Sequence, residues 1–215
     1  MTEELDKTVP ETVASTTGAT APVQSCQSRP IFDAETHTYT SDGKVLPSVT
    51  QILARLGTNC PHWTEESRQR GQAVHAAIAL IHEERLDDDS LDDRIKPYVF
   101  QYRQFQTISG FRPLVWEGVV GSASLGYAGT IDCIGELNGR KVLMDWKTGS
   151  VPSTVAAQLA AYHVAANECG VLGSSEGLGC YALKLEPRRF RLVHVPADAL
   201  DVGWQQFVQA LGVKK

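Results

Sequence analysis

A short turn between two apolar runs limits how this chain can fold. Asn138-Gly139, the strongest short-range signal of a two-residue type I′ hairpin, interrupts the segment Tyr127–Lys147. With these two residues as the turn, Glu136 lies opposite Lys141, and this opposite-charge pair favours the register. The sequence therefore predicts an antiparallel β-hairpin whose cross-strand partners can be counted outward from the turn.

The same register places two aspartates face to face. Counting outward sets Asp132 directly opposite Asp145, and such side chains have Cβ atoms about 4.5–5.5 Å apart, where like charges are destabilising. A divalent cation would offset this repulsion. Lys147 projects from the same face as Asp145 because side chains alternate along a strand. Two carboxylates and a lysine on one face indicate a metal site that cuts phosphodiesters.

Length and charge place this hairpin in one ordinary domain. The 215 residues suit a single domain with a tail. Residues 1–28 are rich in Thr, Ala, Ser, Val and Pro without hydrophobic periodicity, which predicts a disordered N-terminal tail before a domain at 29–215. The net charge of −5 argues against a protein that coats DNA broadly, but it allows a local groove for nucleic acid.

The cysteines and the hydrophobic runs bear on location. The five cysteines are odd in number, widely spaced and free of any C-x-x-C pair, which argues against a disulfide framework or a zinc ribbon and favours reduced thiols. No apolar run reaches the about 18 residues of a membrane span, and the N-terminus lacks the features of a secretory signal. We therefore expect a cytoplasmic protein without membrane contact.

Periodicity and capping residues predict an α/β fold with a central mixed sheet and helices on both of its faces. Ser48 with Gln51 predicts a capping box. Ser90 with Asp93 is a candidate cap for a helix that ends near 109, and Pro97 either kinks that helix or marks its true start. Further helices are expected at 64–85, 152–168 and 197–211, and further strands at 31–39, 44–46, 114–120, 179–185 and 190–195.

Other residues could join the hairpin site, and each has an ordinary alternative. Glu117, in the preceding strand, is either a third acid or a solvent-facing edge residue. His75 lies in a helix of small and apolar residues, where a histidine is more often a core residue than a ligand; imidazole beside carboxylates suits Mn²⁺ as well as Mg²⁺. Gln158 and Tyr162 share a helix face, although taken alone the pair is better explained by an amphipathic helix with an ordinary core tyrosine.

In order along the chain, these motifs resemble the PD-(D/E)xK nuclease superfamily. The RecB-type branch with a Q-x-x-x-Y motif is the most similar. The stretch Leu46–Leu53 is also similar to the mitochondrial genome maintenance exonuclease and to phage-encoded exonucleases. The resemblance covers roughly residues 32–209 and implies a restriction-endonuclease-like core. The matched motifs are His75, Glu117, G-T-I-D ending at Asp132, D-W-K-T-G starting at Asp145, and Q-L-A-A-Y at Gln158–Tyr162.

The resemblance implies a role for each matched residue. His75, Asp132, Asp145 and the Trp146 main-chain carbonyl would bind one or two Mg²⁺ or Mn²⁺ ions, and Glu117 would support the metal site. Lys147 would be the catalytic lysine, and Gln158 and Tyr162 would position the DNA strand. Iron–sulfur members of the branch carry a compact cysteine triplet after the core. Here only Cys169 and Cys180 follow it, far apart, so we expect no iron–sulfur cluster.

The resulting hypothesis is metal-dependent hydrolysis of DNA, by an exonuclease acting on ends or single strands in repair, recombination or phage DNA processing. Arg68 and Arg70 are candidates for contacts with the DNA backbone, with ordinary solvated surface as the alternative. A helicase or a recombinase is a candidate partner. A structure-specific endonuclease and a catalytically silent nucleic-acid-binding or partner-binding module are the competing hypotheses.

Overall fold

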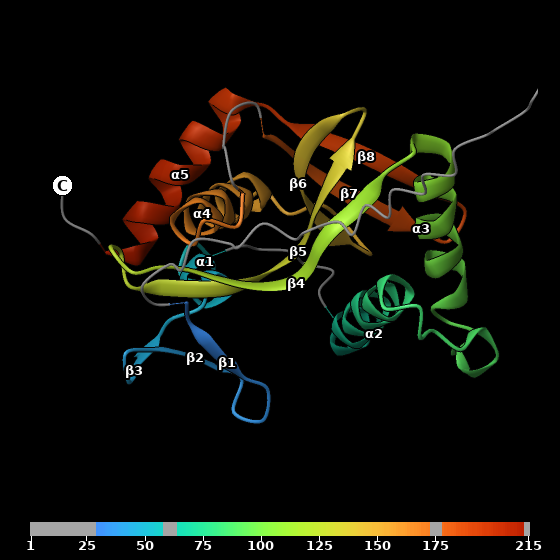
Figure 1. Ribbon diagram of the computed structural model, residues 1–215, viewed down its shortest axis with the longest axis horizontal. Coiled ribbons are helices and arrows are strands. Elements are labelled where there is room, and N and C mark those ends of the chain that lie inside the picture. Colours follow the sequence, from blue (N-terminus) through green and yellow to red (C-terminus); the bar gives the residue numbers. More distant parts are fainter. Residues whose placement is uncertain (1–28, 58–63, 173–177, 213–215) are drawn as a thin grey trace, which may run out of the picture.

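The computed structural model describes residues 29–57, 64–172 and 178–212, which form two β-sheets and five α-helices (Figure 1). The predicted tail at 1–28 lies outside the described residues, as do Cys26 and Cys60. The strands are β1 Ile31–Asp33, β2 Thr38–Ser41, β3 Lys44–Leu46, β4 Arg112–Ser122, β5 Tyr127–Leu137, β6 Arg140–Lys147, β7 Gly179–Glu186 and β8 Arg189–Val195. The helices are α1 Val49–Ala54, α2 Glu65–His82, α3 Lys96–Ser109, α4 Val155–Glu168 and α5 Ala197–Leu211, with a 3₁₀ turn η1 at Asp88–Ser90.

The larger sheet is mixed, as the sequence predicts. Its order is β4-β5-β6-β7-β8; β6 and β7 are parallel, and the other neighbours are antiparallel. Helices α1, α4 and α5 cover one face, while α2 and α3 cover the other (Figure 1). The fold class is therefore confirmed, a mixed sheet between two helical layers as in the restriction-endonuclease-like core.

Each face of the sheet has its own hydrophobic core. Tyr127, Leu159 and Phe207 are buried in the core on the α4–α5 face. Tyr102, Phe105 and Trp146 are buried in the core on the α2–α3 face. Burying each large apolar side chain stabilises the fold by about 1.5–3 kcal/mol. The larger sheet is therefore packed against a hydrophobic core on each of its faces.

The hairpin has the predicted turn and register. Asn138 and Gly139 have φ of +52° and +72°, the left-handed region that a type I′ turn needs at both central positions. Glu136 pairs with Lys141, and the pairing extends outward along both strands. The turn therefore sets which residues of β5 and β6 meet farther along the hairpin.

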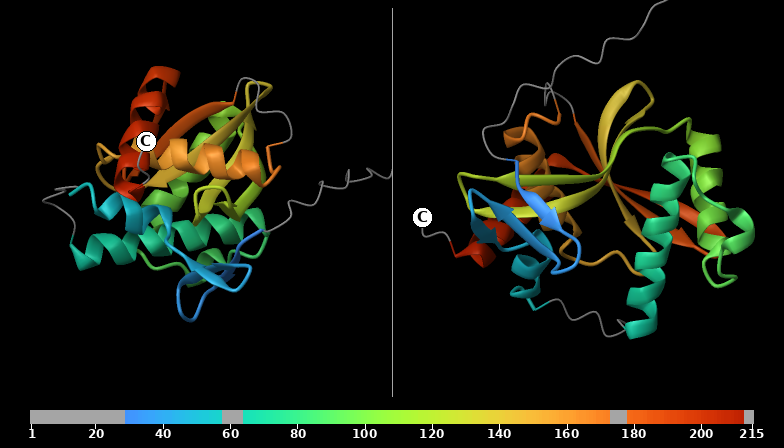
Figure 2. Two further views of the ribbon diagram at one scale, coloured as in Figure 1. Left: turned by 90° about the vertical axis from the view of Figure 1, so that its left-hand side faces the viewer. Right: turned by 60° about the horizontal axis from the view of Figure 1, so that its bottom comes forward.

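The predicted strand at 31–39 is wrong, because two strands and a turn occupy it. Asp33 ends β1, and its carboxylate accepts hydrogen bonds from the backbone N–H groups of Glu35 and Thr36. His37 then has φ +55° before β2 begins. Strands β1, β2 and β3 form a separate three-stranded sheet beside α1 and the β4–β5 ribbon (Figure 2).

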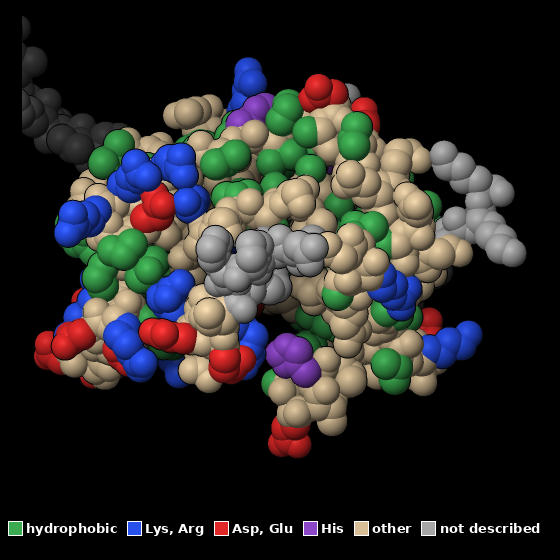
Figure 3. All heavy atoms as spheres, turned by 180° about the vertical axis from the view of Figure 1, so that it is seen from behind, with side chains coloured by type: hydrophobic (Ala, Val, Ile, Leu, Met, Phe, Trp, Pro, Cys, Tyr) green, Lys and Arg blue, Asp and Glu red, His purple; other side chains and the backbone are tan. Residues whose placement is uncertain are grey.

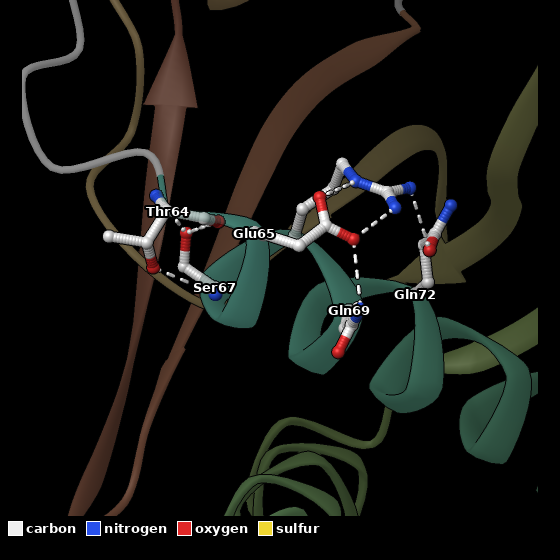
Figure 4. Close-up of polar contacts among 6 residues, drawn as sticks. Thr64, Glu65, Ser67, Gln69 and Gln72 are labelled. Carbon is white, nitrogen blue, oxygen red and sulfur yellow. Dashed lines mark hydrogen bonds and ion pairs between the residues drawn. The ribbon is translucent and has the colours of Figure 1, made fainter.

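Two helices start at a capping box, whereas α3, α4 and α5 start without a side-chain cap. Ser48 forms the predicted capping box with Gln51 at the start of α1. Thr64 and Ser67 form another at the start of α2 (Figure 4). Ser90 does not cap α3: it ends the η1 turn, and α3 starts after Ile95 with Pro97 in its first turn. Proline fits there because the first N–H groups of a helix have no intrahelical partner.

The length and polarity of the helices bear on the predicted lack of membrane contact. Within residues 29–57, 64–172 and 178–212, every helix is too short or too polar to cross a membrane.

Candidate active site

Glu117 and Asp132 lie side by side across β4 and β5. The ladder pairs on either side of them are Trp116–Cys133 and Gly118–Ile131, whereas Glu117 and Asp132 themselves form no ladder pair. Glu117 has φ +46°, a backbone conformation that residues other than glycine rarely adopt. The ladder is therefore interrupted at this row, and Glu117 is turned out of the regular strand geometry.

On the other side of β5, the hairpin ladder stops one residue short of the aspartates. Its last pair is Cys133–Met144, and the next residues outward are Asp132 and Asp145. Here Asp132 Oδ2 accepts a hydrogen bond from the backbone N–H of Trp146 at 2.6 Å. The predicted row of acids is present, but the strands part at it. Glu117, Asp132 and Asp145 thus follow one another across three adjacent strands.

Asp145 is the most deeply buried of the three acids, with 2% of its surface exposed. Its Oδ2 lies 2.7 Å from Lys147 Nζ, but among the described residues this oxygen has no partner with hydrogen-bond geometry. Burial raises the pKa of Asp145 to about 6, opposed by Lys147 and reinforced by Asp132. The Lys147 ammonium offsets part of the cost of burying this carboxylate, and coordination of a cation would offset more of it.

His75 reaches this row of acids from α2. Its Nδ1 lies 3.3 Å from Asp132 Oδ1, and its Nε2 lies 3.0 Å from the Trp146 carbonyl oxygen. Burial opposes the charge of both partners, yet their attraction prevails: the pKa of His75 rises to about 9, and that of Asp132 falls. Any metal that binds this imidazole must therefore displace a proton.

Three donors meet closely enough to hold one cation. Ligand atoms of His75, Glu117 and Asp132 all lie within 4.8 Å of one another. Glu117 has an exposed surface toward solvent. Nearby protein atoms still desolvate its carboxylate, and this desolvation together with Asp132 raises the pKa of Glu117 to about 7. One imidazole and two carboxylates suit Mg²⁺ or Mn²⁺. Of the predicted ligands, Asp145 lies outside this close group, whereas Glu117 lies inside it.

Lys147 is linked to α4 through Gln158. Its Nζ donates a hydrogen bond to Gln158 Oε1 at 3.1 Å in addition to its ion pair with Asp145. Tyr162, one turn farther along α4, is buried, and its ring lies over Gly129, where a Cβ would meet Tyr162 Cε1 at 2.7 Å. The Gln158–Tyr162 face therefore lies against the site, and Gly129 allows this close approach.

A cavity of about 700 Å³ contains the acids and their partners. It lies between the three-stranded sheet, α2 and the β4–β6 strands. All the residues that sequence reasoning placed at the catalytic centre line it, except Trp146, which lines an adjoining pocket. The lining from the centre comprises His75, Glu117, Asp132, Asp145, Lys147, Gln158 and Tyr162. The sequence-predicted centre is thus brought together from α2, three strands and α4.

Comparison with known proteins agrees with this geometry. The family model of the PD-(D/E)XK nuclease superfamily matches residues 52–212. The chain belongs to this superfamily. A search of curated proteins gives no match.

One solved structure has a similar overall fold. A protein from Eubacterium rectale named "Putative exonuclease" is 11% identical, with a TM-score of 0.51 over 79% of this chain and 83% of that chain. At this identity the likeness shows the fold alone. The structure of the protein SSO0001 is 12% identical over 76% of this chain and 84% of that chain, with a TM-score of 0.31.

A second pocket of this nuclease adjoins the first and contains the two predicted arginines. It measures about 320 Å³, shares His75 and Lys147 with the larger cavity, and is lined further by Arg68 and Arg70. The Arg70 guanidinium lies 5.5 Å from the centre of the Tyr98 ring. Both arginines therefore lie next to the predicted catalytic centre, on the α2 side of it.

Arg68 is held along the surface of α2. Its Nε donates to Glu65 Oε2 at 2.9 Å, and its Nη1 donates to Gln72 Oε1 at 3.1 Å (Figure 4). On the face behind that of Figure 1, Lys and Arg side chains are interspersed with Asp and Glu (Figure 3). Positive charge on that face is therefore interrupted by negative charge.

Sequence reasoning missed the aromatic side of the cavity. Phe32, His37 and Tyr39 line it from the three-stranded sheet. The hydroxyl of Tyr39 is 2.8 Å from the Thr130 hydroxyl, across 91 positions of sequence. The aromatic residues around the turn from β1 to β2 were available as a signal, but periodicity alone does not say which surface a small sheet will pack on.

Proposed function

We propose that the nuclease is a Mg²⁺- or Mn²⁺-dependent deoxyribonuclease, an exonuclease that acts on DNA ends or single strands. The observation that carries this proposal is the row of Glu117, Asp132 and Asp145, which shares one cavity with His75 and Lys147. Deep burial of Asp145 beside a second carboxylate is unfavourable for folding by itself. Such an arrangement is typical of a site that needs the charge for function.

In this proposal, His75, Glu117, Asp132 and Asp145 hold one or two divalent ions, together with the Trp146 carbonyl. When bound, the metal would stabilise negative charge on the phosphate oxygens and lower the pKa of a bound water. His75 would release its proton on becoming a ligand, and the N–H of Trp146 would keep Asp132 oriented.

Lys147 is the proposed catalytic lysine. Its ammonium group orients the attacking water and stabilises charge on the phosphate as the bond to the leaving oxygen breaks. Gln158 and Asp145 fix the Nζ from two sides, so the group is pre-positioned before the substrate arrives. Tyr162 supports Gln158 from the next turn of α4 and forms part of the wall along which the DNA strand passes.

Arg68 and Arg70 are proposed to contact the DNA backbone in the adjoining pocket. Their contacts would go to phosphates and carry little sequence information. Binding should then weaken with salt in proportion to the phosphates neutralised. DNA repair, recombination and phage DNA processing are the settings that such an activity fits, with a helicase or a recombinase as the candidate partner and the RecB-type branch as the candidate subfamily.

The test is a digestion time course with end-labelled single-stranded, duplex and closed circular DNA, in Mg²⁺, Mn²⁺ or chelator. We expect metal-dependent loss of the linear substrates, intact circles, and strongly reduced cleavage by Asp145→Asn or Lys147→Met protein that remains folded. Cleavage of closed circles would show an endonuclease instead. Binding of DNA without cleavage in either metal would show a catalytically silent binding module. Full activity of both variants would overturn the assignment of the site.

A further inference from the structure

Three aromatic rings form a cluster at the mouth of the catalytic cavity. Phe32 lies on β1, His37 in the following turn and Tyr39 on β2, and all three line the cavity that also contains Asp132 and Lys147. The Phe32 ring lies 4.8 Å from the Tyr39 ring at 33° and 5.2 Å from the His37 ring at 79°. None of the three belongs to either hydrophobic core of the described residues.

The cluster has a fixed position relative to the catalytic acids. The Tyr39 hydroxyl is 2.8 Å from that of Thr130, which lies two residues before Asp132 on β5. Next to it, the backbone N–H of Ala128 donates to the Pro47 carbonyl at 3.1 Å. The three-stranded sheet is thus attached to β5 on the catalytic side, and Tyr39 is 7% exposed. The rings are held at a constant place beside the metal-binding row.

Two of the rings remain available to a ligand. Phe32 is half-buried, and His37 is exposed in a turn where its φ is +55°. Histidine is among the few residue types other than glycine that adopt this conformation with some frequency. Apolar ring surface that faces a polar catalytic cavity, and not the core, indicates contact with a flat, partly apolar ligand.

We propose that Phe32 and His37 form a stacking platform for an unpaired nucleobase next to the cleaved phosphate. This inference rests on the proposed nuclease function and names its preferred substrate, single-stranded DNA. Stacking on protein rings requires a base whose face is free, and the bases of a duplex cover one another's faces. Since every base has a π-face, the platform should favour single strands without favouring a sequence.

The first test compares binding by full-length protein in which Lys147→Met slows cleavage. Phe32→Leu removes the ring, Phe32→Tyr keeps it, and His37→Asn removes the second ring while tolerating the turn conformation. Ile31→Ala is the matched control, because Ile31 lies on the same strand, is 71% exposed and does not line the cavity. Fluorescence anisotropy measures Kd for a single strand and for the corresponding duplex.

We expect the ring-removing variants to weaken single-strand binding on the order of tenfold, since stacking is worth about 1–3 kcal/mol per base. Phe32→Tyr and Ile31→Ala should bind as the parent does, and duplex affinity should change little. With Lys147 intact, the same substitutions should raise KM for single strands and leave kcat nearly unchanged, as expected for a positioning role.

A series of oligonucleotides with one abasic position at a time makes the test specific. At the position that stacks on Phe32, removal of the base should abolish the effect of Phe32→Leu, because both changes remove the same contact. An equal effect of Phe32→Leu at every abasic position, or on duplex and single strand alike, would overturn the platform. If Phe32→Leu lowers the Tm substantially, His37→Asn carries the test, since His37 is exposed.

Failure of this inference is distinguishable from failure of the proposed function. A wild-type protein that degrades single strands, with ring-removing variants that bind equally well, rejects the platform alone. A wild-type protein that neither binds nor cleaves DNA in Mg²⁺ or Mn²⁺ rejects both.

Discussion

Trp146 donates its backbone N–H to the Asp132 carboxylate at 2.6 Å, just beyond Cys133–Met144, the last ladder pair of β5 and β6. The carboxylate thereby takes the place of a strand carbonyl as acceptor. Its other oxygen faces His75 at 3.3 Å. The end of the ladder thus orients Asp132 with one oxygen on the backbone and the other directed toward the proposed metal ligands.

Substitution of Asp132 should remove metal-dependent stabilisation. In Asp132→Asn the amide oxygen can still accept from the Trp146 N–H, but the charge that attracts a cation is lost. At a metal concentration of about 100 times Kd, binding stabilises the wild type by about 2.7 kcal/mol. We expect the Mn²⁺-induced increase in Tm to disappear in the variant, as measured by thermal unfolding with Mn²⁺ and with chelator.

The control for this prediction lies on the same strand. Glu136→Gln removes a carboxylate that pairs with Arg112 at 2.7 Å, away from the cavity. Its Mn²⁺-induced change in Tm should match that of the wild type. An equal response to Mn²⁺ in Asp132→Asn and wild type would mean that Asp132 is not a metal ligand.

Loss of the Lys147 charge should affect the chemical step more than binding. A preorganised charged group at a developing negative charge typically contributes on the order of 10²–10³ in kcat. We therefore expect Lys147→Met to lower kcat by about this factor, with a smaller change in KM. Lys184→Met is the matched control, because Lys184 is the neighbour of Lys147 in the β6–β7 register but pairs with Glu186 at 2.7 Å. Similar kcat values for the two variants would contradict a special role for Lys147.

The parts of the fold that the sequence predicts well are those decided by local interactions. The Asn138-Gly139 turn needs positive φ at two consecutive positions, and the pairing of the hairpin follows from it. Ser48 caps α1 through Gln51, three residues away. In both cases the partners lie within a few residues of each other, so the pattern in the chain contains the interaction that forms.

The parts that sequence reasoning missed depend on contacts between distant segments. Glu117 leaves the regular strand conformation next to Asp132, which is why it joins the close group of donors while Asp145 does not. Ile131 packs in the core on the α4–α5 face, but Cys133 packs in the core on the other face. The alternation of side chains between the two faces of β5 therefore breaks at Asp132. A sequence pattern with a period of two residues cannot reveal this break.

Gly129 should be essential for the packing of α4 against the sheet. In Gly129→Ala the new Cβ would lie 2.7 Å from Tyr162 Cε1 and 3.3 Å from Val49 Cγ2. Overpacking of this kind costs about 1–3 kcal/mol, and urea unfolding should show that loss. Gly149→Ala is the control, since its Cβ would have no neighbour within 4 Å among the described residues. Unchanged stability of Gly129→Ala would mean that α4 shifts freely and that Tyr162 is not fixed by this contact.

His82 should make the stability of the protein depend on pH. Its Nε2 lies 2.5 Å from the Tyr102 hydroxyl, its ring contacts Trp116, and its Nδ1 is buried without a hydrogen-bond partner in the described part of the chain. Burial lowers the pKa of His82 from 6.5 to about 4. Between these values the unfolded chain binds a proton that the folded chain does not, so stability present above pH 6.5 is lost as the pH falls toward 4.

His82→Gln tests this origin of acid sensitivity, because glutamine can still bond to Tyr102 but does not titrate in this range. The contribution of His82 is on the order of 1–3 kcal/mol, since each pKa unit corresponds to about 1.4 kcal/mol and the ring is only partly buried. Urea unfolding of both proteins near neutral pH and near pH 5 measures it. We expect the wild type to lose more stability than the variant over that interval. An equal loss in the two proteins would assign the acid sensitivity to other groups and leave His82 with a packing role.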